Sequence, residues 1–310
     1  MQTDSVIPLT IVSGFLGSGK TTFVNQILNS EYKSNFLIIV NDFGDISLDE
    51  KIIDSDDVIT FDNGCVCCSL GDNLYEQLSR LLKDECDFEH IIVEASGISD
   101  PRSIADLAIA VDKVYLNDIY IFLDAENFLV RAQDHRLESI IKTQLDAATV
   151  LIMNKCDLST HESKLSIYQW LHEYKCSIPI IEAVRANVRV FFDESSKQAS
   201  KFNKPHNEHQ HNLSSFKQNT INLTSALSRD TFLNIVNQYK NKLLRIKGVV
   251  YFVDDPETPY VINVVGSQMG LEVLTTGKMQ WPSNGWINSI YLRDEEITFE
   301  QFKEDLMSRI

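Results

Sequence analysis

A glycine-rich segment near the N-terminus constrains the fold of this chain more than any other feature. Residues 14–21 read GFLGSGKT, which fits the pattern of a phosphate-binding loop. The apolar, β-branched run at 8–13 before it predicts a buried parallel strand, and apolar residues at helical spacing predict a helix near 20–29 after it. Because strand, loop and helix follow in the order that the pattern requires, we expect this segment to bind the phosphates of a nucleoside triphosphate.

The residue types in the loop indicate separate chemical roles. Glycines let successive backbone N–H groups turn toward phosphate oxygens, and the helix N-terminus adds a partial positive charge. Lys20 is expected to place its cation on the β- and γ-phosphates, and the hydroxyl of Thr21 is expected to bind Mg²⁺. The loop residues predicted to contact the nucleotide are Gly14, Gly17, Ser18, Gly19, Lys20, Thr21 and Thr22.

A second segment predicts which base is bound. The apolar run at 150–153 is followed by Asn154, Lys155, Cys156 and Asp157. A carboxylate at Asp157 can accept hydrogen bonds from both N1–H and the 2-amino group of guanine, a pair of donors that adenine does not offer. Asn154 can bond the base edge or hold the phosphate loop, and Lys155 can cover the ring, so GTP is favoured over ATP.

A third segment is expected to complete the nucleotide site. The strand predicted at 89–93 leads into Glu94, and Gly97 follows shortly after. An acid at this place holds Mg²⁺, and a nearby glycine N–H senses the γ-phosphate. Glu94 is one methylene longer than the more common Asp, so we expect it to act through a water molecule.

Three cysteines close together predict a metal site. Cys65, Cys67 and Cys68 follow a turn-like stretch at 61–64, and their thiolates can reach one tetrahedral ion without supplying a fourth ligand. Soft sulfur favours Zn²⁺ or Cu⁺, and the same ligands suit Co²⁺. A bridge between the adjacent cysteines would be strained, and core cysteines would not cluster beside a polar turn. The open position suits a site that gives its metal away.

The composition indicates in which compartment the protein works and which partners it lacks. The other cysteines are scattered, which is typical of lone thiols in a reducing compartment. The first residues lack the features of a signal peptide, and no apolar run reaches membrane-spanning length, so a cytoplasmic protein with no membrane partner is expected. The net charge of −16 argues against binding nucleic acid.

The distribution of apolar runs predicts an α/β fold of the P-loop NTPase type. Strands and helices alternate, which indicates a mostly parallel sheet covered on both faces, with ligand sites at the carboxyl ends of the strands. The expected strands lie near 8–13, 36–40, 57–61, 89–93, 118–124, 149–153 and 178–181. The expected helices lie near 20–29, 72–83, 101–110, 134–146 and 163–174.

The alternation stops after residue 190, so we divide the chain into a domain at 1–192, a polar linker at 193–215 and a small α+β domain at 216–310. The linker contains His206, His209 and His211, whose role is left open. In the last domain the expected strands lie near 219–223, 243–253, 259–265, 270–276 and 286–292, and the expected helices near 230–240 and 298–309.

Taken together, these segments resemble those of CobW-type metallochaperone GTPases, the group that also includes HypB- and UreG-like proteins. The segments that carry the resemblance are 14–22, 40–45, 64–68, 94–101, 154–157 and 244–248. The resemblance implies a protein that binds zinc, sometimes cobalt, at the three cysteines and hydrolyses GTP to deliver it to a client metalloprotein. Residues 41–45 read NDFGD where the family usually has NEFGE, so Asp45 keeps the charge with a shorter reach. By the resemblance, Asp45 is a candidate for assisting hydrolysis beside Lys20 and Glu94, or for an extra metal ligand. Residues 182–186 lack the family's usual Asn-Pro-x-Ala pattern, so contacts to the base there would come from the backbone.

The function predicted from these features is a GTP-hydrolysing zinc chaperone that cycles between GTP and GDP. Ordering of the segment from residue 41 to 68 by GTP and Mg²⁺ would gather the cysteines, and hydrolysis would release the metal. Two alternatives stay open: a cobalt or iron insertion chaperone of the cobalamin or nitrile hydratase type, and a GTPase with a purely structural zinc site. The sequence leaves the client unnamed and is compatible with a homo-oligomer.

Overall fold

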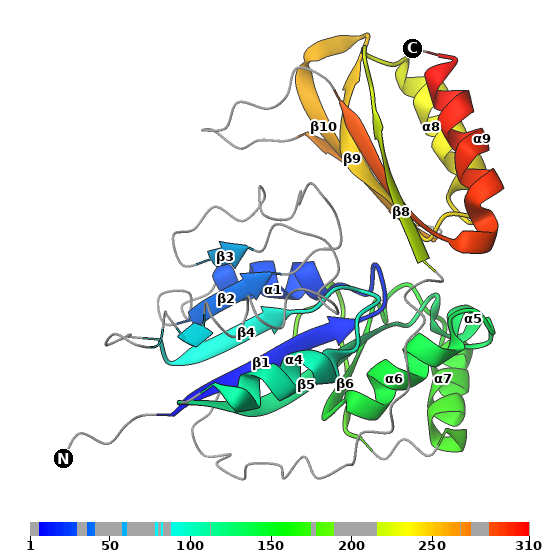
Figure 1. The fold of residues 1–310 in the computed structure, drawn as a ribbon. Helices are drawn as coiled ribbons and strands as arrows, with labels where there is room; N and C mark the ends of the chain where they lie inside the picture. Colours follow the sequence, from blue (N-terminus) through cyan, green and yellow to red (C-terminus); the bar gives the residue numbers. More distant parts are fainter. Residues whose placement is uncertain are drawn as a thin grey trace. The chain divides into compact units, whose positions relative to one another are not determined.

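In the computed structural model the chain forms two compact units, residues 1–211 and 212–310 (Figure 1). The structure describes residues 6–29, 36–40, 58–60, 78–79, 82, 88–111, 113–174, 178–188, 216–266, 268–273 and 285–309. The linker predicted at 193–215 and most of the helix predicted at 72–83 lie outside this part of the chain. The predicted domain limits therefore stay predictions.

The first unit is built on a seven-stranded sheet in the order β3-β2-β4-β1-β5-β6-β7. Every strand pair in it is parallel, which confirms the predicted α/β class. The strands are β1 (Ile7–Gly14), β2 (Phe36–Val40), β3 (Val58–Thr60), β4 (His90–Glu94), β5 (Val114–Asp124), β6 (Val150–Asn154) and β7 (Ile180–Glu182).

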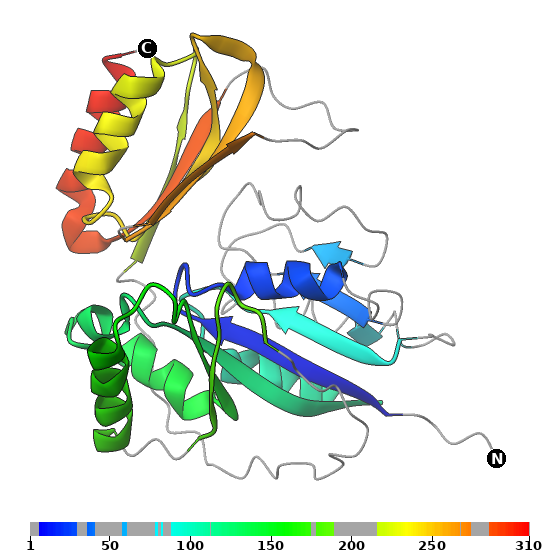
Figure 2. The same ribbon diagram turned by 180° about the vertical axis from the view of Figure 1, so that it is seen from behind.

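Helices cover both faces of this sheet (Figures 1 and 2). The described helices are α1 (Lys20–Leu28), α4 (Pro101–Ala110), α5 (Phe128–Ala132), α6 (Glu138–Ala147) and α7 (His161–Glu173). Helix α1 packs Phe23, Val24 and Ile27 against one face of the sheet, while α4 and α6 contact β1 and β5 from the other side. The apolar runs are therefore buried on both faces, as parallel strands require.

Strand β5 begins at Val114, four residues before the start predicted at 118. The strand was expected near 118–124, which left the polar Asn117 outside it. The structure keeps the strand and shifts its register instead: Leu9 of β1 pairs with Leu116, and Thr10 pairs with Asp118, so that Asn117 is the extra residue of a bulge.

The second unit is a five-stranded sheet with helices on one face, a small α+β fold as predicted. Its strands run in the order β11-β10-β9-β12-β8 with antiparallel pairs. They are β8 (Phe216–Asn222), β9 (Arg245–Phe252), β10 (Asp255–Val265), β11 (Gln268–Val273) and β12 (Trp286–Leu292), and the helices are α8 (Arg229–Tyr239), the short η4 (Arg293–Glu295) and α9 (Glu296–Met307). Phe232 of α8 and Phe302 of α9 are fully buried in its core, and the Tyr291 ring stacks on Phe299 with centroids 4.8 Å apart.

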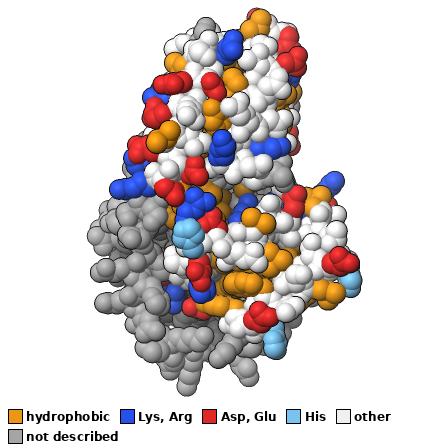
Figure 3. Space-filling model, turned by 90° about the vertical axis from the view of Figure 1, so that its right-hand side faces the viewer, with side chains coloured by type: hydrophobic (Ala, Val, Ile, Leu, Met, Phe, Trp, Pro, Cys, Tyr) orange, Lys and Arg blue, Asp and Glu red, His pale blue; other side chains and the backbone are white. Residues whose placement is uncertain are grey.

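Two further features concern the charge on the surface and the length of the helices. On the face drawn in Figure 3, acidic and basic side chains are mixed, so the negative charge of the chain is not gathered into one patch there. None of the helices in the described part of the chain has the length and apolar character needed to cross a bilayer.

Candidate functional site

The phosphate loop needs its glycines for both conformation and space. Gly14, Gly17 and Gly19 have φ of 131°, 72° and 109°, a region that L-residues rarely adopt. A Cβ on Gly14 would lie 2.3 Å from the backbone oxygen of Phe122, and one on Gly19 would lie 2.2 Å from Nδ2 of Asn154. The loop thus sits directly on the ends of β5 and β6.

Two side chains at the start of α1 are held against neighbouring segments. Nζ of Lys20 donates to the carbonyl oxygens of Gly14, at 2.7 Å, and Phe15, at 3.2 Å, so this buried cation lies within the loop. Oγ1 of Thr21 donates to Oε1 of Glu94 at 2.8 Å. The predicted Mg²⁺ pair, 73 residues apart in the sequence, is therefore brought together because β1 and β4 are neighbours in the sheet.

Unused donors around the loop fit an anionic ligand. The hydroxyls of Ser13, Ser18 and Ser96 are buried and have no hydrogen-bond partner within the described part of the chain. Gly19 caps α1 without a side-chain hydrogen bond, and the first N–H groups of a helix have no partner inside the helix itself. Buried donors of this kind suit phosphate oxygens, so the residues present fit a bound nucleotide.

Gly97 brings the third predicted segment into contact with the loop. A Cβ here would lie 2.5 Å from Cδ2 and 2.9 Å from the backbone nitrogen of Leu16. Nε2 of Gln144, on α6, donates to the Gly97 carbonyl oxygen at 3.2 Å from the other side. Gly97 is therefore packed directly against the phosphate loop.

Asn154 joins the phosphate loop to the loop after β7. Its Nδ2 donates to the Ser18 carbonyl oxygen at 2.9 Å, and its Oδ1 accepts from the Ala186 backbone N–H at 2.7 Å. Of the two roles considered for this residue, the geometry corresponds to holding the phosphate loop. Asp157 is exposed at the same edge of the sheet, where a base could reach it.

The loop after β7 is held by backbone contacts in an unusual turn. Arg185 and Ala186 both have positive φ, 49° and 58°, and the Asn187 N–H donates to the Val184 carbonyl oxygen at 3.0 Å, which fits a type I′ turn. Gln26 of α1 also donates to the Arg185 carbonyl oxygen at 2.7 Å. Within this loop, both contacts are made by backbone atoms.

Two charged residues of the site were missed in the sequence. Asp124, at the end of β5, accepts from Nζ of Lys155 at 2.9 Å, and Nη1 of Arg131 donates to the Leu16 carbonyl oxygen at 3.2 Å. Asp124 could have been predicted from the sequence, because it ends a buried parallel strand at the same sheet edge as Glu94 and Asn154. Arg131 could not have been predicted, because helix α5 was not expected.

The predicted zinc ligands Cys65, Cys67 and Cys68 lie outside the described residues, as do Asp45 and the linker histidines. Within the residues that the structure does describe, no group of three or more His, Cys, Asp or Glu side chains is arranged to hold a metal ion. The metal site therefore rests on the sequence.

Residues 8–182 match the CobW/HypB/UreG nucleotide-binding domain. The chain belongs to this family. Residues 216–303 match the cobalamin synthesis protein cobW C-terminal domain, so the second unit of this CobW-family chain is accounted for as well.

Curated relatives share this sequence at moderate identity. Zinc-regulated GTPase metalloprotein activator 1 of Dictyostelium discoideum is 29% identical over 196 residues, covering 50% of this chain and 41% of that protein. Zinc chaperone CobW of Sinorhizobium sp is 30% identical over 183 residues, covering 49% and 51%. Zinc chaperone YjiA of Escherichia coli is 26% identical over 273 residues, covering 81% and 83%. The matched region thus spans about half the length of the first two relatives.

Proposed function

We propose that this chain is a GTPase that binds zinc at Cys65, Cys67 and Cys68 and passes it to a client metalloprotein. The bridge made by Asn154 carries the nucleotide part of the proposal, because it ties the phosphate loop to the loop beside the predicted base site. The zinc part is supported by the spacing of the cysteines and by relatives that are named zinc chaperones.

The phosphate end of the site supplies charge and donors. Lys20 exchanges loop carbonyl oxygens for the β- and γ-phosphate oxygens, and the Ser18 and Ser96 hydroxyls are buried donors close to the loop. Thr21 and Glu94 would hold Mg²⁺, which supplies neutralisation of the phosphate charge. Gly97 lies against Leu16 of the phosphate loop, which supports the proposal that its N–H responds to the γ-phosphate.

The base end supplies selectivity. Asp157 is exposed and follows β6 at the edge where the phosphate loop lies, so its carboxylate is available to the two donors of guanine. Lys155, whose ammonium group is held by Asp124, is proposed to cover the ring. These two side chains are the basis for expecting GTP rather than ATP.

The sheet connects the nucleotide to the segment that carries the cysteines. Val40, the last residue of β2, pairs with Glu94, so the chain leaves the sheet at residue 41 directly beside the predicted Mg²⁺ ligand. Asp45 and the three cysteines follow on this connection. A change at the γ-phosphate can therefore alter zinc binding through the segment that begins there.

The experiment is a zinc competition titration of the full chain with GTP, with GDP and without nucleotide. Linked sites must affect each other equally, so we expect zinc affinity to differ between the GTP and GDP forms by about 1–3 kcal/mol, with the same shift in GTP affinity when zinc is bound. Thiolates lose protons on binding, so zinc uptake should also release protons and weaken at lower pH.

Two variants separate the parts of the proposal. Replacing Cys65, Cys67 and Cys68 by Ser should remove zinc and the coupling while GTP binding remains, and Lys20→Ala should remove turnover. Identical zinc affinity in both nucleotide states would reject delivery and leave a structural zinc site. Tighter, nucleotide-dependent binding of Co²⁺ than of Zn²⁺ would favour the cobalt alternative.

A further inference from the structure

Asp124 occupies the position between the two ends of the predicted nucleotide site. It is the last residue of β5, which lies between β1 and β6, so the phosphate loop follows the strand on one side and Asn154 ends the strand on the other. Its side chain is only 1% exposed. A buried carboxylate at this point has to be balanced by nearby cations.

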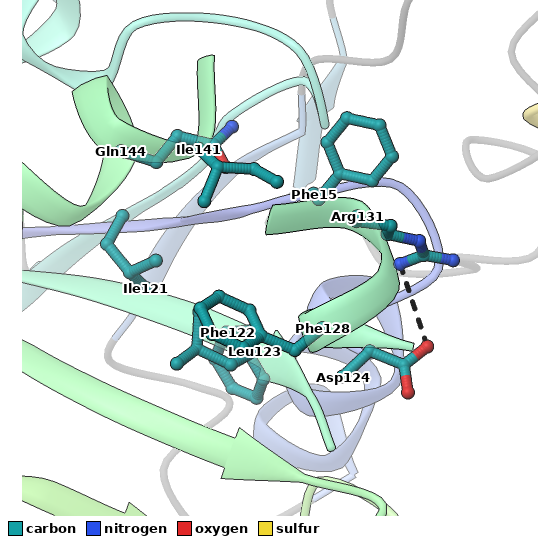
Figure 4. Close-up of a pocket in the computed structure, with 9 residues that line it drawn as sticks. All are labelled: Phe15, Ile121, Phe122, Leu123, Asp124, Phe128, Arg131, Ile141 and Gln144. Carbon is teal, nitrogen blue, oxygen red and sulfur yellow. Dashed lines mark ion pairs between the residues drawn. The ribbon is translucent and has the colours of Figure 1, made fainter. Parts of the chain in front are cut away.

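One oxygen of Asp124 faces two cations that belong to different parts of the site. Oδ2 lies 2.9 Å from Nζ of Lys155. The same oxygen lies 3.7 Å from Nη1 of Arg131, the ion pair that is dashed in Figure 4. Asn127 also donates to Oδ2 at 3.0 Å, and the Glu126 N–H donates to Oδ1 at 3.1 Å, which fixes the carboxylate in the turn before α5. The carboxylate is therefore held rigidly while it faces both cations.

Arg131 carries this connection to the phosphate loop. Its Nη1 donates to the Leu16 carbonyl oxygen, and its guanidinium lies over the Phe15 ring, 5.2 Å from the centroid. Burial lowers the pKa of Arg131, whereas the charge of Asp124 acts in the opposite direction and favours the cation. The charge of Glu126 acts in the same direction, so removing the Asp124 carboxylate would leave this buried cation with the weaker of its two favourable charges.

A small unfilled space lies beside Phe15 of the loop. A cavity of about 20 Å³ lies beside the loop. It has room for roughly one water molecule. Figure 4 shows Phe15 and Arg131 on one side of it and Gln144 and Ile141 on another. Because Phe15 borders this unfilled space, the guanidinium of Arg131 over its ring is one of the contacts that hold this part of the loop in place.

Lys155 also needs a partner to hold its side chain. Its φ of 63° places it in the left-handed region, which is strained for a residue with a side chain. The contact with Asp124 fixes its ammonium group at the end of β5. Without that anchor the long side chain would sample many rotamers before it met a base.

We propose that Asp124 is a positioning residue for GTP, which holds Lys155 at the base end and, through Arg131, the phosphate loop at the other end. One buried carboxylate thus orders both ends of the site together. The inference rests on the proposed binding of GTP and adds a residue to that site.

The test is a titration of the full-length chain with Mg²⁺ and GTP, for the wild type, Asp124→Asn, Lys155→Met and the double variant. Asp124→Asn keeps an acceptor for the turn before α5 but loses the charge, and we expect about tenfold weaker GTP binding. If the two residues act as a unit, the double variant should be weakened by clearly less than the product of the single effects.

Asp118→Asn is the matched control. Asp118 lies on the same strand and is also hydrogen-bonded, accepting from Oγ1 of Thr149 at 2.8 Å, but it is remote from the loop. It should lose stability without losing GTP affinity. Arg131→Lys keeps a cation near Asp124 but loses the contacts with Leu16 and Phe15, and should also weaken GTP binding, which keeps the test decisive if Asp124→Asn folds poorly.

Three outcomes distinguish the possibilities. Failure of the wild type to bind GTP would overturn the proposed function itself. A wild type that binds, with Asp124→Asn and Arg131→Lys both within about twofold of the Asp118→Asn control, would overturn only the role of Asp124. Independent, multiplicative effects of Asp124→Asn and Lys155→Met would show that Asp124 merely builds the turn before α5.

Discussion

Replacing Asn154 by Ala removes one amide that satisfies two buried backbone groups in different loops. The Ser18 carbonyl oxygen loses its donor at 2.9 Å, and the Ala186 N–H loses its acceptor at 2.7 Å. A buried polar group left without a partner costs about 1–3 kcal/mol, so the two together give about 3 kcal/mol after partial hydration of the space vacated. In a unit of this size that corresponds to a fall in Tm of about 6–12 °C.

Thermal unfolding followed by circular dichroism measures this change, and a GTP titration accompanies it. We expect GTP binding to weaken by at least about tenfold, because the phosphate loop and the turn at Arg185 lose their common anchor. Asn288→Ala is the matched control, since Nδ2 of Asn288 donates to Oγ1 of Thr220 at 3.1 Å in the second unit. The control should lower stability and leave GTP binding intact. A fall in Tm below about 2 °C for Asn154→Ala, with unchanged GTP affinity, would refute the reasoning.

Three further outcomes are expected. Burial lowers the pKa of His90 from 6.5 to about 4, so the unfolded chain takes up a proton first as the pH falls. About 3 kcal/mol of the free energy of unfolding that is present above pH 6.5 is therefore lost toward pH 4. Urea titrations at pH 7.5 and 4.5 should show this loss, and His90→Gln should remove it. Gly97→Ala should weaken GTP binding by about tenfold, because its Cβ has to displace Leu16; an unchanged affinity would show that the loop yields freely. Asp157→Asn should shift preference from GTP toward XTP in a competition titration, because it replaces an acceptor by a donor; an unaltered preference for GTP would mean that another group reads the base.

The parts of the fold that the sequence predicted well are those fixed by burial on both sides of the sheet. A continuous apolar run such as 150–153 is buried on both faces when it forms a strand of a parallel sheet. The strand β6 is found there, at Val150–Asn154. Helix α5 was missed because its five residues are too short for periodicity to show. The start of β5 was missed because a bulge lets polar Asn117 stay in a strand, which depends on the partner strand rather than on local sequence.

For the site, the sequence identified side chains and missed the connections between them. The approach of Thr21 to Glu94 follows from the rule that parallel strands end at a shared edge. One partner of Asn154 is the backbone N–H of Ala186. Because nearly every residue has a backbone N–H, the sequence does not indicate which one Asn154 contacts. The contact between Arg131 and Leu16 likewise arises only after α5 has been placed on the sheet.

The central position of β1 affects how the chain is made. Its neighbours in the sheet are β4 and β5, so β1, which ends at Gly14, cannot be fully paired until β5 is complete at Asp124. At usual rates of synthesis the intervening stretch takes about 5–20 s to emerge. During that time β1 keeps at least one open edge, since β4 can pair with it only after residue 94 and β5 only after residue 124. An apolar strand with an open edge is the kind of segment that aggregates. The arrangement that places the phosphate loop at the middle of the sheet therefore also delays the pairing of the strand that carries it.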